Sequence, residues 1–576
     1  MTTQTFVPRL RRRGSAALLV LLLGFAAPDT PIADAAMQGD AARVRALLAE
    51  GQDVNAAQGD GMTALHWASM NGALDLAQLL VGAGAYVNSG TRIGQITPLH
   101  LASRGGHGAV VAALLEAGAD PARVTTNGGA TPLHYAAESG DVAAITALVR
   151  HHANVNAAEP NWGATPLMYA AAKNRPEAIR ALLAAGADPS VRGKAMDMVA
   201  RDAADGAAMA ERDRRVQASV SGLSTIQRPS APEPAAAEAA KDKPLSYADY
   251  IGKYGGLGPL HLAAREGNTD AVLALLEGGA VLDQPSAGDQ STALLIATIN
   301  GYYDLAAVLV ARGANPNLAS EAAVTPLYAA INAEWIPKSR HPQPAEYLQQ
   351  KTTYLQLMEA LLKAGADPNV RVNRNVWFMQ YARSELSVDV GGSTAFWRAA
   401  YAQDVSAMRI LVQYQADPDI PSLNPVPGGY ASRLVSAPDG DDPSGLPPVP
   451  PLGPGIYPLL AAAGVGYGQG SAGYVHRGVP NGWLDAVTYL VGELGADVNA
   501  RDQDGYTAMH HAAARGDNAV IKFLLERGAD PFAIARSGQT TVDMANGPVQ
   551  RIQPFPETIA LLEALGVKNN NRCVSC

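Results

Sequence analysis

A short motif returns along the chain at a nearly constant interval, and this internal period limits the possible folds more than any other feature. Four strong copies of the form TPLHxA lie 34 residues apart and begin at Thr63, Thr97, Thr131 and Thr165. A weaker copy, TPIADAA, begins at Thr30. Each copy closes on a second signature, such as LLEAGADP at 114–121. Repeats this short cannot bury an apolar face alone, so we expect them to stack.

The same motif continues in the second half of the sequence with less regular spacing. Its copies there begin at Gly258, Thr292, Thr325, Thr394, Tyr457, Thr507 and Thr540. Second signatures recur with them, for example LLKAGADPN at 361–369 and LLERGADP at 524–531. Repetition therefore accounts for most of the 576 residues.

Each part of the repeat has a physical role in building two short helices. A threonine followed by proline favours a helix start, because proline fits the first turn, where its missing N–H is harmless. The Ala-Ala pair lets neighbouring helices approach closely. The glycine of Gly-Ala-Asp favours a left-handed helix terminus, and the Asp begins a turn.

With the pattern TPLHxAA…LLxxGADxN in twelve copies from Thr30 to Thr540, the chain resembles the ankyrin repeat family. The resemblance implies an all-α solenoid of stacked helix-turn-helix units with hairpin-like fingers projecting along one edge. It also implies binding of a protein partner through the finger tips and the first helices.

Composition suggests where this array is interrupted. Residues 193–217 resemble a degenerate capping repeat, and 218–245 are rich in Pro, Ala and Ser without an apolar period, as in a disordered linker. We therefore expect a first array at 28–217, a second at 246–570 and a tail at 571–576. The sequence leaves open whether the two arrays stack continuously.

The second array carries four insertions, at 333–353, 371–391, 420–455 and 465–483. Two fall between the helices of one repeat, and two expand fingers. Three of them combine aromatic residues with arginine, which is typical of binding hot spots. The alternative is drift in solvent-exposed loops. The candidate partner-binding residues are Trp335, Arg340, Trp377, Phe378, Tyr381, Arg383, Tyr474, Arg477 and Trp483.

No catalytic constellation is recognisable, and we predict that the protein is not an enzyme. Five histidines share one motif position, which indicates structural hydrogen bonding: His66, His100, His134, His261 and His510. No pair of histidines has the i, i+4 spacing of a zinc helix, so no metal is predicted. The net charge of -9 and the absence of a basic stripe argue against nucleic acid.

The N-terminal 27 residues predict export. Four arginines between Arg9 and Arg13 precede an uncharged apolar stretch, Gly14 to Ala27, that is typical of a secretory signal peptide. The alternative is an uncleaved anchor. After cleavage the formal charge would be 40 − 53 = −13. We expect a periplasmic or secreted monomer that leaves the membrane once the signal is removed.

The only two cysteines, Cys573 and Cys576, form a CxxC pair in the tail. Four interpretations stay open: a terminal disulfide or redox pair, part of a zinc site, an incidental tail, or the start of a c-type haem attachment motif. Haem would require a histidine directly after Cys576, so no cofactor is predicted for the sequence itself.

The main prediction for function is a non-catalytic protein-binding scaffold that is exported. The alternative is the docking arm of a redox protein whose haem or thiol module begins at Cys573. A host-directed effector is a third hypothesis.

Overall fold

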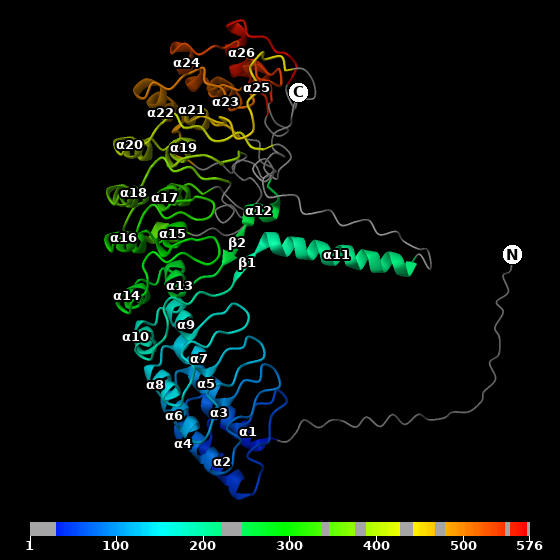
Figure 1. Ribbon diagram of the computed structural model, residues 1–576, viewed down its shortest axis with the longest axis vertical. Helices are drawn as coiled ribbons and strands as arrows, with labels where there is room; N and C mark the ends of the chain where they lie inside the picture. The colour runs from blue at the N-terminus through cyan, green and yellow to red at the C-terminus, as the bar shows by residue number, and fades with distance from the viewer. Residues whose placement is uncertain are drawn as a thin grey trace, which may run out of the picture. The chain divides into compact units, whose positions relative to one another are not determined.

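Each of the twelve repeat starts is the cap of a short helix, and a second helix follows each first one (Figure 1). The computed structural model describes residues 30–220, 245–336, 345–374, 388–426, 442–466, 478–547 and 553–572. The chain divides into two compact units, with the boundary between Asp120 and Pro121. The fold is a mostly helical array of stacked helix pairs, as the sequence predicts.

The first unit contains three helix pairs. Its first helices are α1 (Pro31–Met37), α3 (Ala64–Met70) and α5 (Pro98–Gly105). Its second helices are α2 (Ala41–Ala49), α4 (Leu74–Gly82) and α6 (Gly108–Glu116). First helices pack on first helices and second helices on second, as α1, α3 and α5 show.

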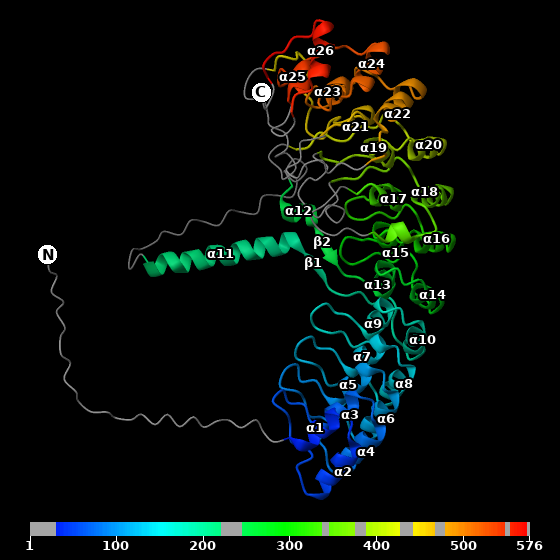
Figure 2. The same ribbon diagram turned by 180° about the vertical axis from the view of Figure 1, so that it is seen from behind.

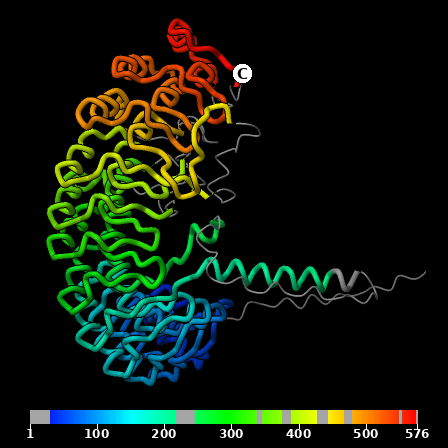
Figure 3. Tube along the Cα trace, turned by 45° about the horizontal axis from the view of Figure 1, so that its top comes forward, coloured from blue at the N-terminus to red at the C-terminus, as the bar shows by residue number. Residues whose placement is uncertain are grey.

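The second unit contains nine pairs among its described residues. The first helices are α7 (Pro132–Ser139), α9 (Pro166–Ala172), α13 (Pro259–Arg265), α15 (Ala293–Ile299), α17 (Pro326–Glu334), α19 (Ala395–Tyr401), α21 (Pro458–Ala462), α23 (Ala508–Ala513) and α25 (Thr541–Asn546). The second helices are α8 (Val142–Arg150), α10 (Pro176–Ala184), α14 (Thr269–Glu277), α16 (Tyr303–Ala311), α18 (Tyr354–Lys363), α20 (Val405–Gln413), α22 (Trp483–Thr488), α24 (Asn518–Glu526) and α26 (Pro556–Ala564). Figure 3 shows these pairs as successive turns of the tube.

The core follows the repeat pattern. In α13, Leu260 is 1% exposed and Ala263 and Ala264 are fully buried, so small side chains let the next helix approach closely. In α14 the apolar face is completed by Leu275, also fully buried. Burying one leucine contributes about 2 kcal/mol, and the repetition of this layer stabilises the stack.

Asparagine side chains join consecutive fingers, and we call this contact the finger rung. Asn317 Nδ2 donates to the carbonyl oxygen of Gly365 at 2.8 Å, and its Oδ1 accepts the N–H of Asp367 at 2.8 Å. Asn55, Asn88, Asn156, Asn369 and Asn499 make the same pair of bonds with the next finger in their own units. The Asn of GADxN is thus an inter-repeat connector as well as a turn residue.

The interruption at 193–257 does not break the stack. Helix α9 packs on α13 and α10 packs on α14, although the intervening chain leaves the repeat pattern (Figure 2). Asn268 Nδ2 donates to the carbonyl oxygens of Ala171 and Ala172 at 3.0 and 3.1 Å, and Asn174 Oδ1 accepts the N–H of Ala271 at 3.0 Å. The question that the sequence left open is answered: the repeats on either side of the interruption pack directly on each other.

The segment expected to be a degenerate capping repeat forms something else. Strand β1 (Ala195–Asp197) pairs antiparallel with β2 (Lys253–Gly255), and helix α11 (Met198–Val220) is one 23-residue helix instead of a short pair. Most of its side chains through Val216 are exposed, because the helix has no apolar stripe to bury. The short helix α12 (Tyr247–Ile251) then leads into β2. The interruption thus adds a two-stranded sheet, with three residues in each strand, to the helical array.

The first insertion, between α17 and α18, contains a 3₁₀ turn at Glu346–Gln349. A π-helical turn, Tyr489–Glu493, follows α22. It coincides with the sequence LVGELGAD, which has one residue more than LLERGAD, and a π turn absorbs one extra residue without breaking the helix. Among the described helices, none combines the length and apolar character needed to span a bilayer.

Candidate functional site

In several repeats a histidine joins the start of the first helix to the next finger. His66 Nδ1 accepts the N–H of Thr63 at 3.1 Å, and its Nε2 lies 3.1 Å from the carbonyl oxygen of Ile96. His134 and His261 repeat this arrangement. Burial lowers the pKa of all three imidazoles, which favours the neutral form with the proton on Nε2. These histidines are built into the stack and are not poised for acid–base chemistry.

In two repeats without histidine, another side chain takes over this role. Trp397 Nε1 donates to the carbonyl oxygen of Ile456 at 2.8 Å, a position equivalent to that of Ile96. Asp543 accepts the N–H and the hydroxyl of Thr540, both at 2.9 Å. A hydrogen-bonding side chain other than histidine can therefore serve at this motif position, although Met168, Leu295 and Leu460 show that some copies carry an apolar residue there.

Part of the third insertion lies along the fingers of the last repeats. We call residues 442–456 the strap. Arg536 Nη1 donates to Asp442 Oδ2 at 2.6 Å and to the carbonyl oxygen of Leu446 at 3.2 Å, and Nη2 donates to the carbonyl of Pro447. The Arg536 side chain is only 14% exposed. One arginine thus holds an extended, proline-rich segment that is about ninety residues away in sequence.

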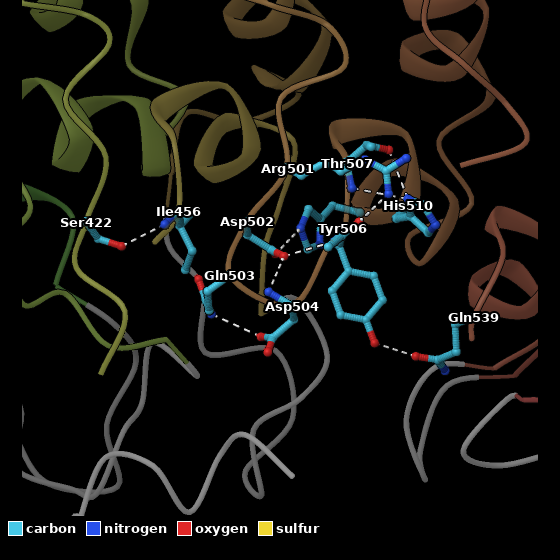
Figure 4. Close-up of polar contacts among 12 residues, drawn as sticks. Ser422, Ile456, Arg501, Asp502, Gln503, Asp504, Tyr506, Thr507, His510 and Gln539 are labelled. Atoms are coloured by element: carbon cyan, nitrogen blue, oxygen red, sulfur yellow. Dashed lines mark hydrogen bonds and ion pairs between the residues drawn. The ribbon is translucent and has the colours of Figure 1, made fainter. Parts of the chain in front are cut away.

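The strap also fits the fingers sterically. A Cβ atom on Gly505 would lie 3.1 Å from Leu446 Cδ1, and one on Gly538 would lie 3.2 Å from Pro443 Cγ. At its other end, Ser422 donates its N–H to the Ile456 carbonyl at 2.9 Å and accepts the Ile456 N–H at its Oγ at 3.0 Å (Figure 4). The strap is therefore anchored at both ends.

The finger at 502–506 carries a buried polar cluster (Figure 4). Asp502 Oδ1 accepts the N–H groups of Asp504 and Tyr506 at 3.0 and 2.9 Å. Asp502 Oδ2 lies 3.3 Å from His511 Nε2, and the two side chains are only 2% and 5% exposed. Asp502 therefore fixes the shape of the finger and joins it to the helix α23.

Asp504 in the same finger has a perturbed acidity. Burial, and next the charge of Asp502, raise the pKa of Asp504 to about 7. Gln503 Nε2 donates to its Oδ2 at 3.0 Å. Arg536 bonds the backbone of this finger as well, with its N–H to the Asp504 carbonyl and its Nε to the Gln503 carbonyl, both at 2.9 Å. The finger and the strap thus share one arginine.

Profiles of ankyrin repeats match the chain at residues 12–91, 32–125, 99–193 and 241–336, and a second ankyrin profile matches 490–545. Together these ranges cover more than half of the sequence. The chain belongs to the ankyrin repeat family.

Individual relatives of this ankyrin repeat protein match only short segments. Human BCL-6 corepressor-like protein 1 is 36% identical over 83 residues, which are 14% of this chain and 5% of that protein. The BTB/POZ domain and ankyrin repeat-containing protein NPR1 of Malus hupehensis is 26% identical over 140 residues, 24% of this chain and 22% of that protein. A putative ankyrin repeat protein of Neisseria meningitidis is 40% identical over 45 residues, 8% and 18% respectively. The chain therefore spans less than a quarter of each of these relatives.

The human ASB11 ankyrin repeat domain superposes with a TM-score of 0.33 and 25% identity, covering 46% of this chain and 91% of that one.

Two of the predicted partner-binding residues lie in the described part of the ankyrin repeat protein, and both are engaged within it. Trp335 is half-buried, and its Nε1 donates to Asp404 Oδ2 at 3.0 Å. Tyr354 donates to the same oxygen at 2.6 Å and meets the Trp335 ring edge-on, with centroids 6.3 Å apart. Arg398 Nη2 donates to the Trp335 carbonyl at 2.6 Å. This tryptophan anchors the first insertion to α20 and α19.

Trp483 stands at the start of α22, and the Arg515 guanidinium lies 3.8 Å from its ring centroid. Arg515 Nε also donates to the Ala463 carbonyl at 3.0 Å, so the fourth insertion is tied to the following repeat. The remaining candidates lie outside the described residues: Arg340, Trp377, Phe378, Tyr381, Arg383, Tyr474 and Arg477, together with Cys573 and Cys576. Within the described ranges, no three His, Cys, Asp or Glu side chains converge as metal ligands would.

Several residues of the polar networks were not singled out from the sequence, although a signal for some of them exists. The fifth motif position, x in TPLHxA, is apolar or aromatic in most copies but is Asp34, Arg398 or His511 in three. Each of the three is hydrogen-bonded, to Gln58 at 2.6 Å, to Asn332 at 2.7 Å and to Asp502 at 3.3 Å respectively. Comparing the copies position by position would have found them. Nothing in the sequence links Arg536 to the strap.

Proposed function

We propose that this ankyrin repeat protein is a non-catalytic scaffold that binds extended polypeptide along the finger edge of its second half. The observation that supports the proposal is the strap, a stretch of the chain itself that lies on this edge and is held by Arg536.

The chemistry of this contact is transferable to a partner. Arg536 donates hydrogen bonds to two main-chain carbonyls and one carboxylate. These acceptors are available in any extended segment that carries an acidic residue before prolines. Prolines hold such a segment extended at low entropic cost, which favours binding. A partner with this character would compete with the strap.

The test supplies the strap in trans. A fluorescent peptide of residues 442–453, DPSGLPPVPPLG, is titrated into the full chain and into a variant with residues 442–450 replaced by a short Gly-Ser linker. We expect saturable binding to the replaced variant and at least tenfold weaker binding to the parent. In the parent, the strap already occupies the same surface at high effective concentration.

A matched pair of controls completes this experiment. Adding Arg536→Gln to the strap-replaced variant should abolish binding, whereas adding Arg527→Gln, in a neighbouring repeat, should not. A peptide with the same composition in scrambled order tests the sequence dependence. If the replaced variant binds neither peptide, or binds both equally, the finger edge is not a polypeptide-binding surface of this kind.

We also propose that the protein is exported, which rests on the arginine run and the apolar stretch Gly14 to Ala27. Expression of the full chain followed by N-terminal sequencing and cell fractionation tests this. Cleavage near residue 27 and recovery outside the cytoplasm would support export, and an intact N-terminus in the cytoplasmic fraction would refute it.

A further inference from the structure

A cavity of about 310 Å³ lies where the chain re-enters the stack before α13. Helix α12 and strand β2 form one side of it, and helix α15 with the fingers before α15 and α17 forms the other. Figures 1 and 2 both show α12 and β2 next to the α13–α15 region. Its volume is at the lower end of the range for small-molecule sites and is too small for a folded partner element.

The body of the cavity is apolar. Ile251 and Leu257 line it from the re-entering segment, and Ile296 and Ile299 line it from α15. Ile296 is 8% exposed, so this wall is part of the protein interior. A ligand that fills the space therefore needs an apolar body of about the size of an aromatic ring.

The carboxylate of Asp289, which lines the cavity, already accepts several hydrogen bonds. Asp289 accepts hydrogen bonds from the Ser286 hydroxyl at 3.0 Å, from the Ser291 N–H at 3.2 Å and from the Ser291 hydroxyl at 2.7 Å. These bonds hold the finger in shape and leave Asp289 little capacity to receive a cationic ligand.

The opposite holds for Arg374, whose side chain also lines the cavity and is 16% exposed. Its Nε is buried and has no hydrogen-bond partner among the described residues. Its Nη2 lies 3.9 Å from Glu321 Oε2, a separation longer than a hydrogen bond. A buried guanidinium N–H without an acceptor costs free energy that an incoming anion would recover.

We propose that this cavity binds a small carboxylate with an apolar body, its carboxylate paired with Arg374 and its body against Ile296 and Ile299. A planar guanidinium matches a carboxylate in a bidentate geometry. Lys253 and Arg265 also line the cavity but are paired with Asp197 and Glu266, so Arg374 is the cation that the ligand would meet. A phosphate fits less well, because the apolar walls cannot replace the hydration of a doubly charged group.

The test uses the full chain and matched probes. Phenylacetate, hexanoate, phenylacetamide and phenethylamine are titrated by calorimetry and by saturation-transfer NMR. We expect saturable binding of phenylacetate or hexanoate in the millimolar range or tighter, and at least tenfold weaker binding of the neutral amide and of the cation. The ratio between the two acids reports whether the cavity prefers an aromatic or an aliphatic body.

Variants separate the site from non-specific binding. Arg374→Gln should weaken carboxylate binding at least tenfold, and Ile299→Phe should do the same by filling the cavity without touching the charge. Arg312→Gln, an exposed arginine at the end of α16, is the matched control and should change nothing. The proposal is overturned if neither acid binds saturably at about 10 mM, equivalent to a binding free energy near −3 kcal/mol, or if Arg374→Gln binds as the parent does.

Discussion

The raised pKa of Asp504 predicts that the finger at 502–506 loses stability as the pH rises. In the folded protein this carboxyl titrates at about 7, compared with 3.8 for an ordinary aspartate. A group whose folded pKa is raised contributes stability that is fully present below the unfolded pKa and is lost as the pH passes the folded pKa. The loss should therefore fall between about pH 4 and pH 7 and be complete above it.

The magnitude follows from the size of the shift. A difference of about three pKa units corresponds to at most about 4 kcal/mol, at 1.36 kcal/mol per unit. The Asp504 side chain is only half-buried, so water screens its charge and reduces the effect. We expect about 2 kcal/mol.

The perturbation is Asp504→Asn, which keeps the shape and the acceptor for Gln503 but removes the charge. Urea unfolding of the full chain, followed by circular dichroism at several pH values from 4 to 9, measures the free energy of unfolding of parent and variant. The two should coincide near pH 4, and the variant should be about 2 kcal/mol more stable at pH 8. The buried histidines, whose lowered pKa values make the stack less stable as the pH falls, affect both proteins equally and cancel in the difference.

Glu563→Gln, an exposed carboxylate in α26, is the control and should leave the pH profile parallel to that of the parent. Parallel profiles for Asp504→Asn and the parent across the whole range would refute the reasoning, as would a variant that is less stable at pH 8.

Five further substitutions, two of them matched controls, test individual contacts by urea unfolding. Asn317→Ala removes both bonds of a finger rung and should cost about 1 to 2 kcal/mol. Arg398→Met removes the guanidinium that donates to Asn332 Oδ1 and to the Trp335 carbonyl oxygen and should cost about 3 kcal/mol, whereas Lys363→Met breaks an exposed pair and should cost less than about 0.5 kcal/mol. Gly267→Ala should cost more than Gly279→Ala, because both glycines have positive φ but only the first would place a Cβ 2.4 Å from the Tyr302 ring.

Each of these predictions has a result that would contradict it. An unchanged unfolding midpoint for Asn317→Ala would mean that water replaces the rung. Equal costs for the arginine and lysine variants would mean that burial does not decide the value of the contact. Equal costs for the two glycine variants would mean that Tyr302 moves aside freely.

Much of the fold is predictable from the sequence because the repeat encodes each helix pair locally. The capping threonine, the proline after it and the glycine of GAD act over a few residues, so all twelve starts were found. The segment at 193–257 was not predicted, because whether it forms a pair or one long helix depends on tertiary contacts such as the pairing of β1 with β2.

The candidate site was predictable only in part, for a related reason. The sequence pattern of an aromatic residue near an arginine is the same whether the side chains contact a partner or the protein itself. Trp335 donates a hydrogen bond to Asp404, and the Trp483 ring packs against the Arg515 guanidinium. Both contacts join elements that are separated in sequence. The strap is harder still, since its recognition by Arg536 uses main-chain carbonyls that carry no sequence signature.

The direct packing of α9 on α13 has a consequence for how the chain can be cut. The chain between the first helices α9 and α13 runs from Ala172 to Pro259, whereas the chain between α7 and α9 runs only from Ser139 to Pro166. Closing the longer connection costs only about 1 kcal/mol more in loop entropy. The long excursion therefore weakens this junction little, and the junction is held by side-chain packing and by Asn268 and Asn174. We expect two separately expressed polypeptides, divided between α11 and α12, to reassociate through this packed junction at sufficient concentration, which would make the interruption a split point of the protein.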